Sequence, residues 1–191
     1  MVRIIAGEFR SRRLLSPRTA AVRPTSDRVK ESLFQILAPR LAGARVLDLY
    51  AGTGNLGLEA LSRGAAACCF VERSASFCAI IRKNIARLGL EERTEVLRLD
   101  CPRALGLLAK RGDRFSLALA DPPYAKKKGM ESELKKILLA LDGCDTLAPG
   151  ALVVAEHFKC DPPQERLAHL RIVGQRRYGD TVISFFAVPE K

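Results

Sequence analysis

The sequence predicts an α/β protein with an open, doubly wound, mostly parallel sheet, and three observations indicate this class. Short apolar runs alternate with segments of helical periodicity from residue 45 to residue 158. A glycine-rich turn directly follows the first apolar run, and the last two runs, 170–179 and 181–189, have no helix-length segment between them. Parallel strands need long crossovers, whereas a short turn joins antiparallel strands. We therefore expect a seven-stranded sheet with an antiparallel C-terminal pair.

The segment before the first of these runs is expected to form a β-hairpin and a helix. The arms "VRIIAG" and "FRSRRLL" flank Gly7 and Glu8, which predicts a small N-terminal hairpin. A helix is expected within 23–37, ended by Pro39. Its candidate caps are Thr25, Ser26 and Asp27, and its apolar stripe is Val29, Leu33, Ile36 and Leu37.

The rest of the chain continues as alternating elements. Strands are expected over 45–50, 66–72, 94–100, 115–121 and 151–158, and helices over 55–64, 74–90, 102–112 and 129–143, with a short charged helical stretch around 163–169. No repeat or linker divides the chain. We expect a single domain over 1–191, with 1–22 as a basic extension and 23–191 as the core.

Composition and charge narrow the class of protein. The six cysteines form no C-x-x-C pair, so we expect reduced thiols in a cytoplasmic protein and no metal site. Neither a signal peptide nor a membrane-spanning run is apparent. The formal charge is +11, and residues 1–30 carry eight basic and two acidic side chains, which is +6 of that total. This basic arm predicts a polyanionic partner, although a solvated arm remains an alternative.

The motif Gly52-x-Gly54-x-x-Gly57 has the spacing of a dinucleotide-binding loop. Asp48 lies four residues before Gly52, at the end of the first strand. A carboxylate there would repel a pyrophosphate but would suit a cofactor with a cationic amino group and a sulfonium, such as S-adenosylmethionine. The loop alone leaves a nicotinamide or flavin dinucleotide open.

Acidic residues also end the next three predicted strands: Glu72, Asp100 and Asp121. Glu72 could accept hydrogen bonds from ribose hydroxyls in either cofactor scheme, and Asp100 could accept one from an adenine amino group. A single acid at such a position is commonly a helix cap. Four acids in register around a glycine loop favour a binding site.

The tetrapeptide Asp121-Pro122-Pro123-Tyr124 follows the fourth predicted strand. Prolines have no amide donor, so the carboxylate of Asp121 and the carbonyl of Pro122 are two acceptors beside an aromatic ring. We expect them to hold a planar NH2 group, turning its lone pair toward a methyl donor while Tyr124 stacks on the base. A tight turn with a capping aspartate is the alternative. Lys126, Lys127 and Lys128 follow and would meet phosphates beside an extruded nucleotide.

The motifs "DLYAGTG" and "DPPY" together resemble class I amino-methyltransferases that use S-adenosylmethionine. The segments "RIIAGEFRSRRL", "RPTSDRVKESLFQIL", "LGLEALSRGA", "FVE" and "YGDTVISFF" extend the resemblance nearly end to end, to the bacterial 16S ribosomal RNA guanine-N2 methyltransferases of the RsmD type. This similarity implies a Rossmann-like methyltransferase fold and methylation of one guanine amino group in small-subunit RNA or an assembly particle. We expect a monomer.

The resemblance also implies roles for particular residues. Asp48, Gly52 and Gly54 would hold the methionine end, Glu72 the ribose and Asp100 the adenine. Arg23, Pro24 and Thr25 match a segment that closes over the cofactor. Tyr50, Ala51, Thr53, Arg73 and Cys101 complete the expected cofactor site, and Arg10, Arg12 and Arg13 the expected RNA contacts. Three alternatives stay open: a DNA adenine amino-methyltransferase, a dinucleotide-dependent oxidoreductase, and a noncatalytic RNA-binding protein.

Overall fold

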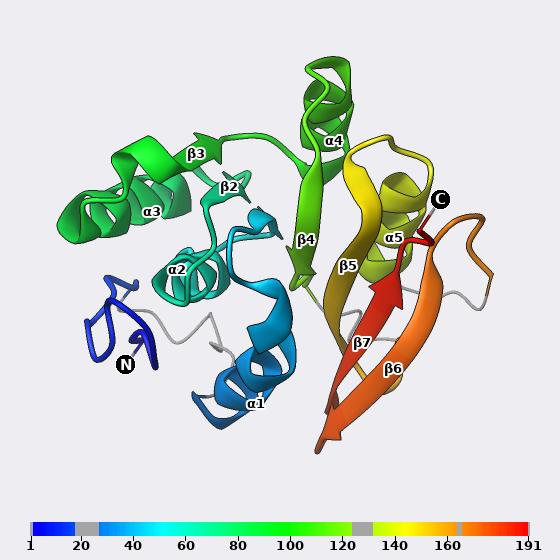
Figure 1. Ribbon diagram of the computed structural model, residues 1–191, viewed down its shortest axis with the longest axis horizontal. Coiled ribbons are helices and arrows are strands. Elements are labelled where there is room, and N and C mark those ends of the chain that lie inside the picture. Colours follow the sequence, from blue (N-terminus) through cyan, green and yellow to red (C-terminus); the bar gives the residue numbers. More distant parts are fainter. Residues whose placement is uncertain (1, 18–26, 124–131, 164–165, 191) are drawn as a thin grey trace. The chain divides into compact units, whose positions relative to one another are not determined.

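A computed structural model describes residues 2–17, 27–123, 132–163 and 166–190 (Figure 1). The chain divides into two compact units, residues 1–98 and 99–191, and each is described by itself. Among the described residues seven strands form a mixed sheet, and its C-terminal pair is antiparallel. The predicted fold class is confirmed. Within the same residues, no helix is both long enough and apolar enough to cross a membrane.

The first unit contains three parallel strands: β1 (Arg45–Leu49), β2 (Ala67–Val71) and β3 (Thr94–Leu97). Their order is β3-β2-β1, and Asp48 of β1 pairs with Phe70 of β2. β1 and β2 are buried along nearly their whole length, as expected for strands covered on both faces. Their carboxyl ends therefore emerge together at one edge.

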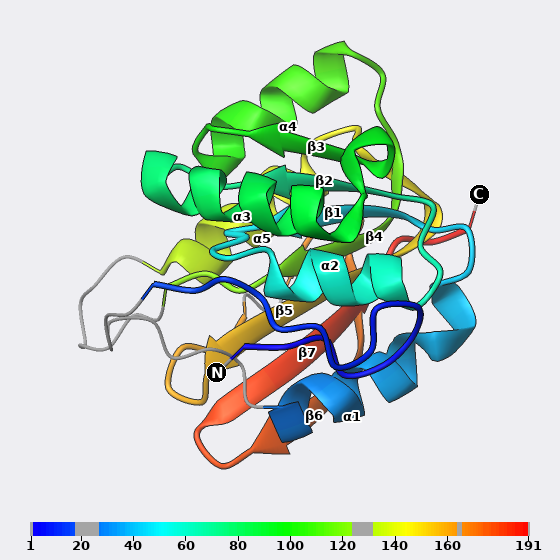
Figure 2. The same ribbon diagram turned by 90° about the vertical axis from the view of Figure 1, so that its left-hand side faces the viewer.

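The helices of this unit begin and end where local signals predict. They are α1 (Asp27–Leu37), the short η1 (Ala38–Arg40), α2 (Asn55–Ser62), α3 (Ala75–Leu88) and the short η2 (Glu91–Arg93). The hydroxyl of Ser74 accepts the N–H of Phe77 and caps α3, and Gly89 ends it with φ +67°. α2 packs against β1 and β2, and α3 against β3 (Figure 2).

The buried face of α1 differs from the predicted stripe. Leu33 and Leu37 are buried as expected, but Ile36 is 40% exposed, and Phe34 and Lys30 are buried in its place. The face follows the spacing i, i+3, i+4, i+7 from Lys30. The prediction was wrong because it excluded a lysine from an apolar face.

The N-terminal arms meet as an irregular hairpin. Arg3 and Arg13 form one antiparallel bridge, and Leu14 N donates to Val2 O at 3.0 Å. The turn is longer than the predicted Gly7-Glu8 pair and includes Ser11, with φ +66°. A Cβ on Gly7 would lie 1.8 Å from the carbonyl oxygen of Ser62, so only glycine permits this approach to α2 (Figure 2).

The second unit contains β4 (Phe115–Ala120), β5 (Leu147–Phe158), β6 (Arg171–Tyr178) and β7 (Thr181–Ala187), in the order β4-β5-β7-β6. β4 and β5 are parallel, and β7 is antiparallel to both of its neighbours. The helices are α4 (Cys101–Lys110) and α5 (Glu133–Asp142). The predicted C-terminal pair therefore corresponds to β6 and β7.

The charged helical stretch predicted around 163–169 is not helical in its described residues. Instead, the carboxylate of Asp142 at the end of α5 accepts the backbone N–H groups of Ala168, His169 and Leu170, at 2.5 to 2.7 Å. Partial burial disfavours the charged form, but these three donors outweigh it and lower the pKa of Asp142. A side chain distant in sequence thus satisfies the backbone that a helix would have satisfied internally.

Candidate active site

Three of the four predicted strand-end acids lie at the carboxyl ends of their strands, whereas β3 ends at Leu97, three residues before Asp100. In the first unit, Asp48 is the penultimate residue of β1 and Glu72 directly follows β2. In the second unit, Asp100 is the N-cap of α4 and Asp121 directly follows β4. Carboxyl ends of strands are where ligands bind in open α/β sheets.

The loop between β1 and α2 has an unusual backbone. Gly52 and Gly54 have φ +55° and +78°, and Tyr50 has φ +58°, which is rare for a residue with a side chain. Such conformations gather at functional sites. Among the described residues, a Cβ added to Gly52 would have one neighbour within 4 Å, the carbonyl oxygen of Tyr50 at 3.9 Å. Within the described part of the chain, Gly52 therefore leaves space beside the loop, where a ligand can approach the backbone.

Backbone donors of this loop are bonded within the protein. Gly52 N donates to Glu72 Oε2 at 3.0 Å, and Gly54 N donates to Ala51 O at 2.7 Å. Glu72 is 9% exposed, and its Oε1 accepts the N–H of Ser74 at 2.7 Å. A pyrophosphate-binding loop needs its amides for the ligand. Here the amides of Gly52 and Gly54 already donate hydrogen bonds within the protein, and the acceptor for Gly52 is the buried carboxylate of Glu72.

Asp48 is turned into the interior of the first unit. It is 2% exposed, and its Oδ2 accepts the N–H of Gly57 at 2.9 Å. Burial, with a smaller contribution from nearby Glu72, raises the pKa of Asp48 to about 8, although the hydrogen bond from Gly57 acts in the opposite direction. The carboxyl therefore holds a proton at neutral pH, and it would lose that proton to solvent when a cationic group binds beside it.

The third glycine of the motif serves packing. A Cβ on Gly57 would lie 2.4 Å from Phe70 Cε1 and 2.6 Å from Cys68 Sγ. Both distances are shorter than any real Cβ contact, so glycine lets α2 lie directly on β2. This is the role of the third glycine in dinucleotide-binding loops as well.

Other predicted cofactor residues of the first unit have different environments. Ala51 and Thr53 are buried, and the carbonyl of Thr53 accepts a hydrogen bond from Asn84 Nδ2 at 3.1 Å. Arg73 is exposed. Arg23 and Thr25, with Pro24, lie outside the described residues.

In the second unit, the side chain of Asp100 caps α4, and its Oδ1 accepts the N–H of Arg103 at 3.0 Å. The neighbouring Cys101 is buried. Helix capping is the alternative role that we gave above for a single acid at such a position. A capping carboxylate still has lone pairs that can accept a hydrogen bond from a second donor. An adenine-binding role for Asp100 stays a prediction.

The tetrapeptide Asp121-Pro122-Pro123-Tyr124 begins directly after β4. Asp121 is half-buried, Pro122 is buried and Pro123 is exposed, while Tyr124 lies outside the described residues. The register of β4 with β5 ends at Ala120 and Ala155, and the next residues in sequence are Asp121 and Glu156. Glu156 is 9% exposed. Sequence reasoning missed this second acid because it treated "ALVVAEHF" only as a strand.

The structure describes some of the predicted RNA-contacting residues and not others. Arg10, Arg12 and Arg13 are exposed on the N-terminal hairpin. Lys126, Lys127 and Lys128 lie outside the described residues. The exposed arginines have the accessibility that phosphate contacts need.

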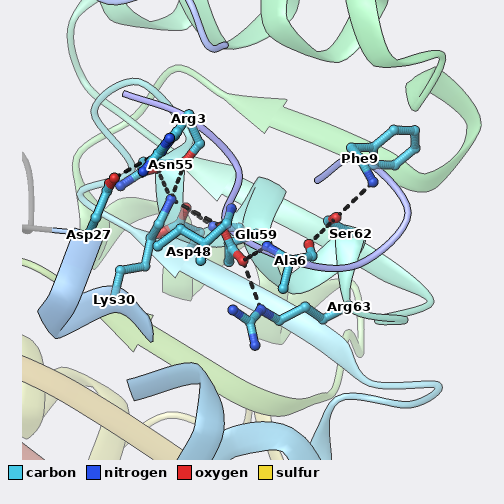
Figure 3. A network of polar contacts seen from close by, with 12 residues as sticks. Arg3, Ala6, Phe9, Asp27, Lys30, Asp48, Asn55, Glu59, Ser62 and Arg63 are labelled. Atoms are coloured by element: carbon cyan, nitrogen blue, oxygen red, sulfur yellow. Dashed lines mark hydrogen bonds and ion pairs between the residues drawn. The ribbon is translucent and has the colours of Figure 1, made fainter. Parts of the chain in front are cut away.

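A buried ion pair beneath the hairpin was also missed (Figure 3). Lys30 and Glu59 are both fully buried, and Lys30 Nζ lies 3.1 Å from Glu59 Oε2. Lys30 Nζ also donates to Arg3 O at 2.5 Å and to Asn55 Oδ1 at 2.8 Å, and Glu59 Oε2 accepts the N–H of Ile5 at 2.8 Å. Burial lowers the pKa of Lys30, and Glu59 opposes that shift. The available signal was the position of Lys30 on the apolar face of α1.

Comparisons with known proteins match nearly the whole chain. Residues 2–187 match a family model described as conserved hypothetical protein 95. YlbH of Bacillus subtilis, named as a candidate rRNA methyltransferase, is 36% identical over 97% of this chain and 98% of its own length. Ribosomal RNA small subunit methyltransferase D of Escherichia coli is 37% identical over 81% of this chain and 74% of its own length.

A solved structure has the same fold over the full chain. YhhF from Escherichia coli, described as a candidate methyltransferase, has a TM-score of 0.84 and 29% identity, covering 100% of this chain and 99% of its own. The expected Rossmann-like methyltransferase architecture is thereby confirmed.

Proposed function

The chain belongs to the conserved hypothetical protein 95 family, the RsmD type that its sequence resembles, and from this premise we propose that it methylates small-subunit ribosomal RNA with S-adenosylmethionine. The finer proposal is transfer to the exocyclic N2 of one guanine in 16S RNA. We propose that the reaction takes place in the bacterial cytoplasm, on the RNA or on an assembly particle. The protein would act as a monomer that consists of a single domain.

One observation in the glycine loop carries the choice of cofactor. The N–H of Gly52 is bonded to the buried Glu72, and Asp48 is buried in the same unit. The Gly52 amide is not available to a pyrophosphate, and a cationic ligand would stabilise the ionised form of Asp48. S-adenosylmethionine supplies an electrophilic methyl group on a sulfonium. An RNA methyltransferase from Salinibacter ruber was solved with S-adenosyl-L-homocysteine. It has this fold, with a TM-score of 0.65 and 17% identity, and the match covers 88% of this chain and 95% of its own.

The residues present fit this cofactor. The open side of Gly52 allows its approach, and Asp48, Gly52 and Gly54 would bind the methionine end. Glu72 would accept from the ribose hydroxyls through lone pairs not used by Gly52 and Ser74. We assign the adenine to Asp100 and the remaining contacts to Tyr50, Ala51, Thr53, Arg73, Cys101, Arg23 and Thr25.

The substrate amine would be held by Asp121 and the carbonyl of Pro122, with Tyr124 stacked on the base. A guanine amino lone pair is delocalised into the ring, so two hydrogen bonds that turn it out of plane make it a better nucleophile. The nitrogen forms a bond to the methyl carbon as the carbon–sulfur bond breaks, and the amine proton passes to Asp121 or to water. Alignment contributes about 7 to 11 kcal/mol in such reactions.

RNA binding would depend on the basic N-terminal hairpin. Residues 1–30 carry +6 of the formal charge of +11, and Arg10, Arg12 and Arg13 are exposed. Lysines 126–128 would contact phosphates beside the target nucleotide. Contacts of this kind predict a steep loss of affinity with salt.

The test is transfer of a labelled methyl group from S-adenosylmethionine to small subunits from cells that lack this protein. We expect incorporation by the wild type, N2-methylguanosine as the labelled product, and a loss of at least about 100-fold in rate for Asp121→Asn. Asp145→Asn is the matched control, because Asp145 is exposed on the same unit and pairs with Arg114. Label on duplex DNA instead, or no effect of Asp121→Asn, contradicts the proposal.

A further inference from the structure

Asn84 of α3 bonds both the glycine loop, which connects β1 to α2, and the N-terminal segment, residues 2–17. Its side chain is 1% exposed. Asn84 Nδ2 donates to the carbonyl oxygens of Thr53 and Leu15, both at 3.1 Å, and its Oδ1 accepts the N–H of Leu15 at 2.7 Å. The amide therefore bonds the backbone of Leu15 as a neighbouring strand would, and the backbone of Thr53 with the same nitrogen.

Leu15 fixes the orientation of this amide. With its oxygen bonded to Leu15 N, the nitrogen of Asn84 must face the two carbonyls, because a flipped amide would place oxygen against oxygen. The backbone of Leu15 acts here rather than its side chain, which is 37% exposed. The docked N-terminal segment thus determines where Asn84 directs its donor.

Thr53 lies between the two glycines whose positive φ values shape the loop. Glycine adopts many conformations in the unfolded or unliganded chain, so a loop of this composition must be held from outside to keep one conformation. Glu72 holds it at Gly52 N and Asn84 holds it at Thr53 O. Both bonds come from residues that follow the loop in sequence: Glu72 directly follows β2, and Asn84 lies in α3.

We propose that Asn84 is a positioning residue of the cofactor loop, and that the docked N-terminal segment sets its orientation. The proposal rests on the proposed function, in that this loop binds S-adenosylmethionine. It extends that function by making the hairpin that carries the RNA-contacting arginines also a support of the cofactor site.

Two substitutions separate this role from a general effect on folding. Asn84→Asp keeps the acceptor for Leu15 N but replaces the donor to Thr53 O by an oxygen. Ser62→Ala is the matched control: Ser62 is 3% exposed and bonds the same N-terminal segment, accepting from Phe9 N at 3.0 Å and donating to Ala6 O at 2.6 Å. Neither of its bonds reaches Leu15 or the glycine loop.

The readouts are the Kd of S-adenosylmethionine by titration calorimetry, kcat and KM in the methylation assay, and the melting temperature of each variant. We expect both variants to melt earlier. Asn84→Asp should raise the Kd and the KM for the cofactor about threefold to tenfold, with kcat at saturating cofactor little changed. Ser62→Ala should leave the Kd unchanged.

Each outcome has one meaning. If Asn84→Asp binds the cofactor as the wild type does, or if Ser62→Ala weakens binding equally, the positioning role is overturned and the proposed function stands. If the wild type itself binds no S-adenosylmethionine, the proposed function falls, and this inference with it. Should Asn84→Asp not fold, Asn84→Ser, which can still donate one hydrogen bond, replaces it with the same expected direction.

Discussion

Asp48→Asn exchanges a buried carboxyl for a neutral amide of the same shape. In the wild type, burial raises the pKa of Asp48 to about 8 from an ordinary value of 3.8. The amide oxygen can still accept the N–H of Gly57, which lies 2.9 Å from Asp48 Oδ2. The substitution therefore removes a titrating group and keeps the main contact of the side chain.

The magnitude follows from proton linkage. Between pH 4 and pH 8 the folded protein holds a proton on Asp48 that the unfolded chain has released, so the free energy of unfolding of the wild type falls as pH rises. The slope is about 1.4 kcal/mol per pH unit for one proton. From pH 5 to pH 7 the variant should therefore gain on the order of 3 kcal/mol relative to the wild type.

Urea unfolding of both proteins at pH 5, 6 and 7, without cofactor, measures this difference. Groups that titrate equally in the two proteins cancel in the comparison, so the change with pH isolates Asp48. A difference that stays constant over this range, or that shrinks as pH rises, refutes the reasoning about a buried, protonated Asp48.

Three further predictions concern stability. Gly57→Ala should destabilise the protein by about 1 to 3 kcal/mol or more, because its methyl would overlap Phe70, whereas Gly106→Ala, in open space on α4, should stabilise it by about 0.5 to 1 kcal/mol; thermal melts that rank the two alike would contradict this. Glu59→Leu should lower the free energy of unfolding in urea by about 3 to 5 kcal/mol, because it leaves the buried Lys30 without its ion-pair partner Glu59. A protease should also cleave the N-terminal segment faster than in the wild type, and unchanged cleavage would argue against anchoring by Glu59. Burial lowers the pKa of His157, so its contribution to stability should be present above pH 6.5 and lost as pH falls below it, and His157→Gln should abolish this dependence in unfolding curves between pH 5 and pH 7.5.

Patterns with a short range in sequence predicted the fold well. The alternation of apolar strands and periodic helices predicted α3 over 74–90, within two residues of its observed ends. The joined runs at the C-terminus predicted β6 and β7, because no crossover fits between them. These signals succeed because each depends on neighbouring residues only.

Features that depend on distant partners were not predictable. Lys30 is buried because Glu59 and Arg3 O meet it across the fold, and no pattern around it reports those partners. Asp142 replaces a predicted helix by bonding backbone groups 26 residues or more away. The glycine loop was located from sequence, but the bonds of Gly52 to Glu72 and of Thr53 to Asn84 required the structure.

Nucleoside mass spectrometry of small-subunit ribosomal RNA shows whether this protein methylates a guanine amino group there. RNA from cells lacking this protein should miss one N2-methylguanosine, which the wild-type protein restores and Asp121→Asn does not. An unchanged set of methylated nucleosides in the deletion strain would contradict the account.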